Sequence, residues 1–125
     1  FSEFCNVLVT PLNSEGNLYT FGLLPWTHLI IWPGKGIVLI NYLPKNIDQC
    51  IIEIKLASAS LCENDLENWK KSILEFLGED KVIVESVHNS YLENFKLGPP
   101  NRLEQRIIHW QKIYKDFLNA SGISF

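Results

Sequence analysis

The chain reads HLIIWPGKGIVLINYL at positions 28–43. Two apolar runs rich in isoleucine, leucine and valine are separated here by PGKG, which combines a proline with two glycines. A connection this short favours two antiparallel strands, because a parallel pair needs a much longer crossover. We therefore predict a β-hairpin that joins residues 28–32 to residues 36–43.

Similar apolar runs lie on both sides of this hairpin. Turn-prone residues such as Pro11, Pro25 and Pro44 separate them from one another. Short turns between neighbouring strands predict an antiparallel sheet in which each strand pairs with the next one along the chain. The expected strands cover residues 4–10, 17–24, 28–32, 36–43 and 49–58.

The pattern changes from strand to helix near residue 60. Ser60 and Glu63 have the spacing of a capping box, which predicts a helix that begins after Ser60. Apolar residues then recur at helical spacing, namely Leu66, Trp69, Ile73, Phe76 and Leu77. A second helix is expected between Pro99-Pro100 and Gly122. Its apolar stripe consists of Leu103, Ile107, Trp110, Ile113, Tyr114 and Phe117.

Strands followed by helices indicate an α+β fold, with a curved antiparallel sheet covered by helices. We expect one domain over residues 1–125, with sheet strands in 1–60 and helices in 61–120. The apolar fraction of 46% and charged fraction of 20% are those of an ordinary globular protein. Because the chain contains no methionine, even at position 1, we expect it to be part of a longer protein.

Charge and cysteine usage limit the function classes. A net charge of −3 argues against a nucleic-acid-binding protein, which usually shows a basic patch. No apolar run reaches the roughly 18 to 20 residues that span a bilayer. The three cysteines show no C-x2-C spacing, which argues against a zinc site or a disulfide framework and indicates a cytoplasmic protein.

The stretch FLGEDKVIVE at positions 76–85 allows two interpretations. In the first, Gly78 ends the helix, residues 79–81 form a turn, and the β-branched residues 82–87 form a strand. In the second, the helix continues through Gly78 at a cost of about 1 kcal/mol relative to alanine. The residues alone leave both interpretations open.

The second interpretation gives Asp80 an unusual place. At 100° per residue it lies on the midline of an apolar stripe, within about 40° of Trp69 and Ile73, while Glu79 points away. An ionised carboxylate there requires a cation or strong hydrogen-bond donors. The candidates are a metal ion, an arginine such as Arg102 or Arg106, or a water-filled pocket.

Residues 78–118 resemble the C-terminal end of the α subunit of Rieske-type non-haem iron oxygenases. The likeness rests on Glu79-Asp80, Glu85-Ser86-Val87, Gly98-Pro99-Pro100, and a closing stretch from Leu103-Glu104 through His109-Trp110 to Tyr114. Upstream, residues 18–57 resemble the family's sheet, with an aromatic-proline strand end and a P-x-x-x-D turn. The likeness covers most of the chain, in order.

The resemblance implies a helix-grip fold, in which a curved antiparallel sheet wraps around a long C-terminal helix with a pocket between them. This chain would then form the C-terminal portion of the catalytic domain. The family holds a mononuclear Fe(II) with two histidines and one carboxylate, and Asp80 falls on the carboxylate position. The apolar residues that would line or dry the site are Phe76, Leu77, Ile83, Val84 and Val87.

The resemblance also implies reaction partners. In the family, a reductase or ferredoxin passes electrons to a [2Fe–2S] Rieske cluster in a separate domain. O₂ is then activated to hydroxylate, dihydroxylate or demethylate a small organic substrate. Full-length family members are often homotrimers.

Several family features are missing from this sequence. The histidines His28, His88 and His109 include no H-x4-H pair, and the C-x-H and C-x2-H motifs of a Rieske cluster are absent. His88 stands where the family commonly has glutamine, about 80° from Asp80 on a continuous helix. We therefore expect one of three iron ligands here, and no activity from the chain by itself.

Two other functions fit the same sequence. A helix-grip scaffold also suits a non-catalytic module that binds a hydrophobic small molecule. Its ligand would contact Phe21, Trp26, Trp32 and Tyr42. The other alternative is a decayed oxygenase remnant, whose exposed strand edges would favour association.

Overall fold

The computed structural model describes residues 2–13, 16–93, 98–99, 101–102 and 104–122. The chain divides into two compact units. The first unit, here called the sheet unit, consists of Phe1–Ser60 and Pro100–Phe125. The second, the helix unit, is Leu61–Pro99. Each unit is described by itself.

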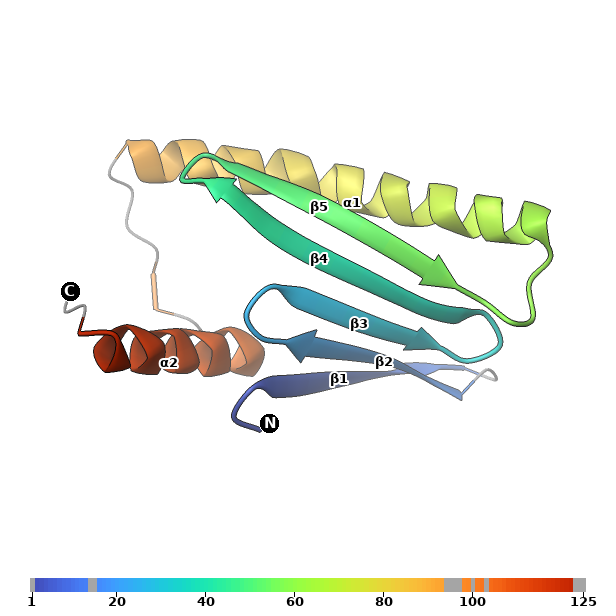
Figure 1. Ribbon diagram of the computed structural model, residues 1–125, viewed down its shortest axis with the longest axis horizontal. Helices are drawn as coiled ribbons and strands as arrows, with labels where there is room; N and C mark the ends of the chain where they lie inside the picture. Colours follow the sequence, from blue (N-terminus) through green and yellow to red (C-terminus); the bar gives the residue numbers. More distant parts are fainter. Residues whose placement is uncertain (1, 14–15, 94–97, 100, 103, 123–125) are drawn as a thin grey trace. The chain divides into compact units, whose positions relative to one another are not determined.

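The sheet unit contains a five-stranded antiparallel sheet with the order β1-β2-β3-β4-β5 (Figure 1). This confirms the predicted pairing of each strand with the next, because short apolar runs and tight turns are local signals. The strands are β1 (Cys5–Leu12), β2 (Gly16–Leu23), β3 (Thr27–Trp32), β4 (Gly36–Asn46) and β5 (Gln49–Ala57). The predicted turn joins β3 to β4, and positive φ angles at Gly34 and Gly36 explain its two glycines.

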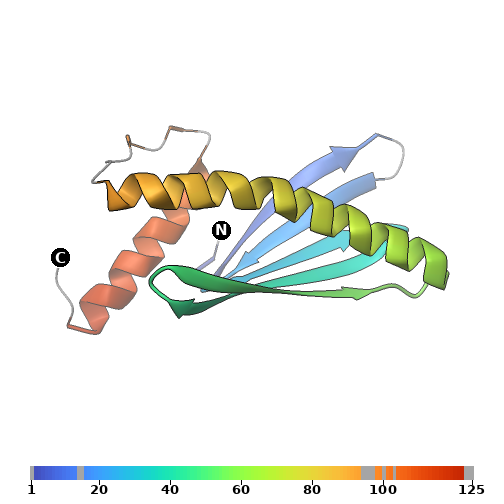
Figure 2. The same ribbon diagram turned by 90° about the horizontal axis from the view of Figure 1, so that it is seen from above.

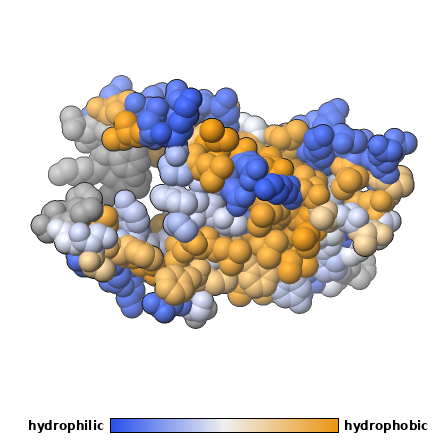
Figure 3. Space-filling view, in the orientation of Figure 1, coloured by the Kyte–Doolittle hydropathy of each residue, from blue (hydrophilic) through white to orange (hydrophobic). Residues whose placement is uncertain are grey.

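The two faces of the sheet differ in burial. The inner face carries the buried core residues Val38 and Ile40, which are 0% and 3% exposed. The outer face carries Thr27, Asn41 and Glu53, which lie in register across β3, β4 and β5. Hydrophobic residues cover much of this outer face, seen as orange in Figure 3. The strands twist relative to one another, as Figure 2 shows.

The helix α2 (Gln105–Ala120) belongs to the sheet unit. It confirms the second predicted helix, although it begins a few residues later than the sequence pattern indicated, and Leu103 lies outside the described residues. Ile113 is the buried residue of its stripe. Aromatic contacts join the helix to the strands, because the ring of Trp110 lies 6.0 Å from that of His28.

The helix unit contains α1 (Glu63–Leu92), a single helix of 30 residues. It runs through Gly78, which confirms the continuous interpretation and shows that a turn at 79–81 and a strand at 82–87 were wrong. Once a helix is nucleated, each added residue gains a hydrogen bond, so one glycine and a few β-branched residues do not end it. An ion pair from Lys81 to Glu85, 3.6 Å long, links successive turns after the glycine.

The predicted capping box is wrong. The helix begins at Glu63, and the amide of Leu66 donates to the carbonyl of Cys62. The hydroxyl of Ser60 donates instead to the Gly34 carbonyl at 3.1 Å, back in the sheet unit. The serine therefore holds the turn after β3 and does not cap α1.

The α+β class is confirmed by these elements. Neither helix, in the part of the chain that the structure describes, is long and apolar enough to cross a membrane.

Candidate functional site

Asp80 lies in the middle of α1, and its side chain is exposed. Trp69, about three turns earlier on the same face, is buried at 6% exposure. Glu79 beside it is exposed as well. Asp80 takes part in none of the ion pairs among the described residues, and the neighbouring Lys81 pairs with Glu85. The carboxylate of Asp80 is thus available to a cation from outside these residues.

The apolar residues expected around Asp80 share the helix α1. Leu77 is half-buried, whereas the other four are exposed. Their exposed fractions are 57% for Phe76, 63% for Ile83, 65% for Val84 and 41% for Val87. The stripe therefore divides into a covered part near Trp69 and an open part that surrounds Asp80.

The other candidate metal ligands are divided between the units. His88 lies on α1 with Asp80, whereas His28 and His109 belong to the sheet unit. Among the residues with described positions, no three or more of histidine, cysteine, aspartate and glutamate form a group that could hold a metal ion. The described residues thus supply no three-ligand group by themselves.

The sheet unit holds a second group of polar residues, which sequence patterns did not indicate. We call it the Asn6 cluster, and it consists of Asn6, His28, Arg106 and His109. Asn6 on β1 is buried at 1% exposure. A buried side-chain amide normally needs hydrogen-bond partners, and the cluster supplies them. The other three members are half-buried.

Gly22 makes room for this cluster. It lies in register between Asn6 on β1 and His28 on β3. A Cβ atom at Gly22 would stand 2.8 Å from Asn6 Oδ1, 3.2 Å from Arg106 Nη2 and 3.3 Å from Trp110 Cζ2. A side chain at this position would therefore push α2 away from the strands.

The hydrogen bonds of the cluster form one directed chain. Arg106 Nε donates to Asn6 Oδ1 at 2.7 Å, and Asn6 Nδ2 lies 3.3 Å from His109 Nδ1. His109 Nε2 lies 2.8 Å from the carbonyl oxygen of Ser2, which can only accept. The network thus assigns the proton of His109 to Nε2 and lets Nδ1 accept from Asn6.

His28 is the residue of the Asn6 cluster whose protonated, charged form is disfavoured. Burial lowers the pKa of its imidazole below the ordinary 6.5, and the positive charge of Arg106 lowers it further. Its ring packs edge-on against Tyr42, with centroids 5.4 Å apart, and against Trp110. His28 is therefore a neutral aromatic contact at neutral pH.

Arg106 carries the positive charge of the cluster. Burial lowers the pKa of its guanidinium below the ordinary value, but the group stays charged. Among the described residues Arg106 has no carboxylate partner, and its Nε donates to the amide oxygen of Asn6. Chemically the cluster positions α2 on the strands through a charge-assisted hydrogen bond, a role that needs no ligand.

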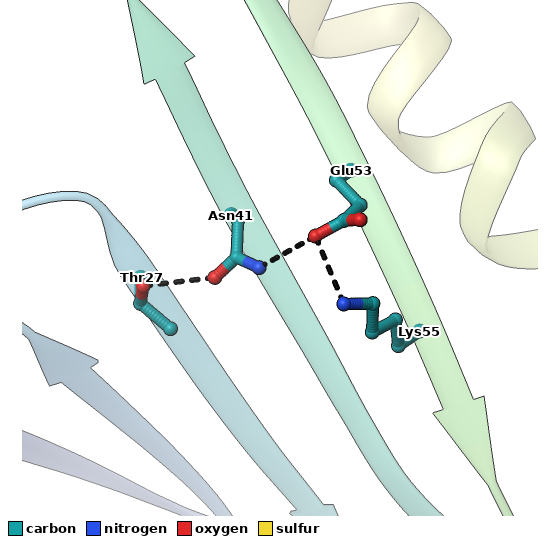
Figure 4. Close-up of polar contacts among 4 residues, drawn as sticks. All are labelled: Thr27, Asn41, Glu53 and Lys55. Carbon is teal, nitrogen blue, oxygen red and sulfur yellow. Dashed lines mark hydrogen bonds and ion pairs between the residues drawn. The ribbon is translucent and has the colours of Figure 1, made fainter.

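The outer face carries a polar row of its own, shown in Figure 4. Thr27 Oγ1 donates to Asn41 Oδ1, and Asn41 Nδ2 donates to Glu53 Oε2, each at 2.9 Å. Lys55 adds an ion pair to the same carboxylate oxygen at 3.2 Å. These partners, Asn41 first and Lys55 second, hold the pKa of Glu53 below its ordinary value. The row links three strands across an otherwise apolar face.

The four aromatic residues considered for a hydrophobic ligand do not share one face. Trp32 and Tyr42 have the same orientation as Val38 on the inner face, whereas Phe21 pairs with Leu29 on the outer face. Trp26 lies in the turn before β3. A single ligand site made of all four is therefore not formed within the sheet unit.

No protein-family model, curated protein or solved structure matches the chain.

Proposed function

We propose that this chain forms the C-terminal portion of the catalytic domain of a Rieske-type oxygenase. The observation that carries the proposal is the unbroken α1, which presents Asp80, two residues after Gly78, on the same face as Trp69. The resemblance required such a helix, whereas the β-branched residues that follow Gly78 favoured a strand. The antiparallel sheet that precedes α1 also agrees with the family's order of elements.

In this proposal Asp80 is the carboxylate ligand of a mononuclear Fe(II). The proposal also includes the helix-grip arrangement, in which the sheet wraps around the long helix. The Asp80 side chain suits the ligand role because it is exposed and has no described protein cation to neutralise it. The remaining two ligands would be histidines of a preceding part of the protein. The reaction class is the insertion of oxygen from O₂ into, or oxidative demethylation of, a small organic substrate.

The sequence of the intact native protein tests this proposal. An oxygenase requires an H-x4-H pair and the paired C-x-H and C-x2-H motifs of a Rieske cluster upstream of Phe1. A native chain whose N-terminal residue is Phe1, or an upstream region without these motifs, would overturn the proposal. N-terminal sequencing together with intact mass measurement distinguishes these outcomes.

A further inference from the structure

The open edge of β1 has an unusual composition. The strand reads CNVLVTPL and contains no charged residue. Val7, Leu8 and Val9 are 41%, 46% and 45% exposed. Within the described sheet β1 pairs with β2 alone, so its other edge is unpaired. Proteins usually protect such an edge with charged residues, proline, bulges or a covering segment.

The hydrogen bonds at the start of β1 show which backbone groups point to the open edge. The amide of Leu24 donates to the carbonyl of Phe4 at 3.0 Å, and these two residues continue the register of β1 with β2. Because directly bonded pairs alternate along an antiparallel ladder, the even-numbered residues of β1 exchange hydrogen bonds with β2. The odd-numbered residues direct their N–H and C=O groups to the open edge.

Both ends of this edge are already closed. The carbonyl of Cys5 accepts from the amide of Ser2 at 2.8 Å and from its hydroxyl at 3.2 Å. At the other end Pro11 has no N–H to donate. Between them, Val7 and Val9 each present one donor and one acceptor that no described residue satisfies.

We propose that β1 pairs antiparallel with β1 of a second copy of this chain, about a two-fold axis at Leu8. Val7 then lies opposite Val9 of the second copy, and each such pair exchanges two N–H···O=C bonds. The carbonyl of Cys5 falls opposite Pro11 of the second copy. The acceptor that is already satisfied therefore meets the residue that cannot donate.

Neighbouring two-fold registers fit less well. An axis at Val7 places the amide of Val9 from the second copy against the occupied carbonyl of Cys5. An axis at Val9 places the carbonyl of Val7 opposite Pro11, which leaves that acceptor without a donor. The register centred on Leu8 is thus the one of these three that satisfies both valines.

The side chains agree with this register. Leu8 and its copy lie directly opposite each other on the inner face, and the valines line up on the outer face. No charged side chain of β1 opposes the approach. The other sheet edge differs, because β5 carries Glu53 and Lys55. Charged residues of this kind discourage pairing between edges.

Sedimentation equilibrium of the 125-residue chain tests the pairing. The expected mass is twice 14.4 kDa. Val9→Pro removes an N–H that points away from β2, so the sheet is retained while the mass falls to that of the monomer. A wild-type chain that sediments as a monomer, or a Val9→Pro variant that stays dimeric, would overturn the proposal.

Ile52→Pro on β5 is the matched control. The amide of Tyr42 donates to Trp26, so the same alternation directs the N–H of Ile52 to the open edge of β5. This variant should therefore remain a dimer. If Ile52→Pro dissociates the dimer and Val9→Pro does not, β5 is the interface and β1 is excluded.

Disulfide trapping tests the register without a proline. After the cysteines Cys5, Cys50 and Cys62 are replaced by serine, Leu8→Cys should form an intermolecular disulfide under mild oxidation. Opposed residues of a non-hydrogen-bonded pair have Cα atoms about 4.5 Å apart, within disulfide range. Thr10→Cys should not form an intermolecular disulfide, because Asn6 of the second copy lies opposite Thr10. Equal trapping at both positions, or trapping at Thr10 alone, contradicts the register.

Discussion

Gly22 is the residue on which the packing of α2 depends most directly. Gly22→Ala places a Cβ 2.8 Å from Asn6 Oδ1 and should lower the free energy of unfolding by about 1–3 kcal/mol. Gly78→Ala is the matched control, because a Cβ there meets nothing within 4 Å. It should raise helix stability by about 1 kcal/mol. Urea denaturation followed by circular dichroism measures both, and equal effects of the same sign would contradict this account.

The titration of His28 gives the protein a pH-dependent stability. Because its folded pKa lies below the ordinary 6.5, the unfolded chain binds a proton first as the pH falls. Stability should therefore decline below about pH 6.5 and become independent of this group below the folded pKa. His28→Gln should remove that part of the decline. Parallel curves of unfolding free energy against pH for the two proteins would show that His28 does not contribute.

At the scale of the elements, the polar row links β3, β4 and β5. Asn41→Ala removes its hydrogen bonds to Thr27 and Glu53 and should cost about 1–2 kcal/mol. It should also return the pKa of Glu53 toward its ordinary value, because Asn41 is the largest cause of the lowering. Carboxyl chemical shifts measured against pH check this directly. Lys55→Ala, which removes an exposed ion pair, should change stability by well under 1 kcal/mol.

The elements differ in how well local sequence predicts them. The strands and their order follow from short apolar runs and turn residues, and the structure agrees. For α1 the residues after Gly78 are β-branched, so local propensity opposes the helix that cooperative extension produces. The Asn6 cluster could not be predicted, because Asn6 and Arg106 lie 100 residues apart. No sequence pattern around either residue indicates that the two are in contact.

At the scale of the whole molecule, the central proposal concerns Asp80. The pairing at the edge of β1 rests on different observations, namely the register and hydrogen bonds of β1. The most direct measurement is the iron content of the longest native protein that contains this sequence, compared between Asp80→Ala and Glu79→Ala. Both carboxylates are exposed neighbours on α1, so the two variants change charge equally. The account predicts about one iron per chain in the wild type and in Glu79→Ala, and almost none in Asp80→Ala. Iron retained in full by Asp80→Ala would contradict it.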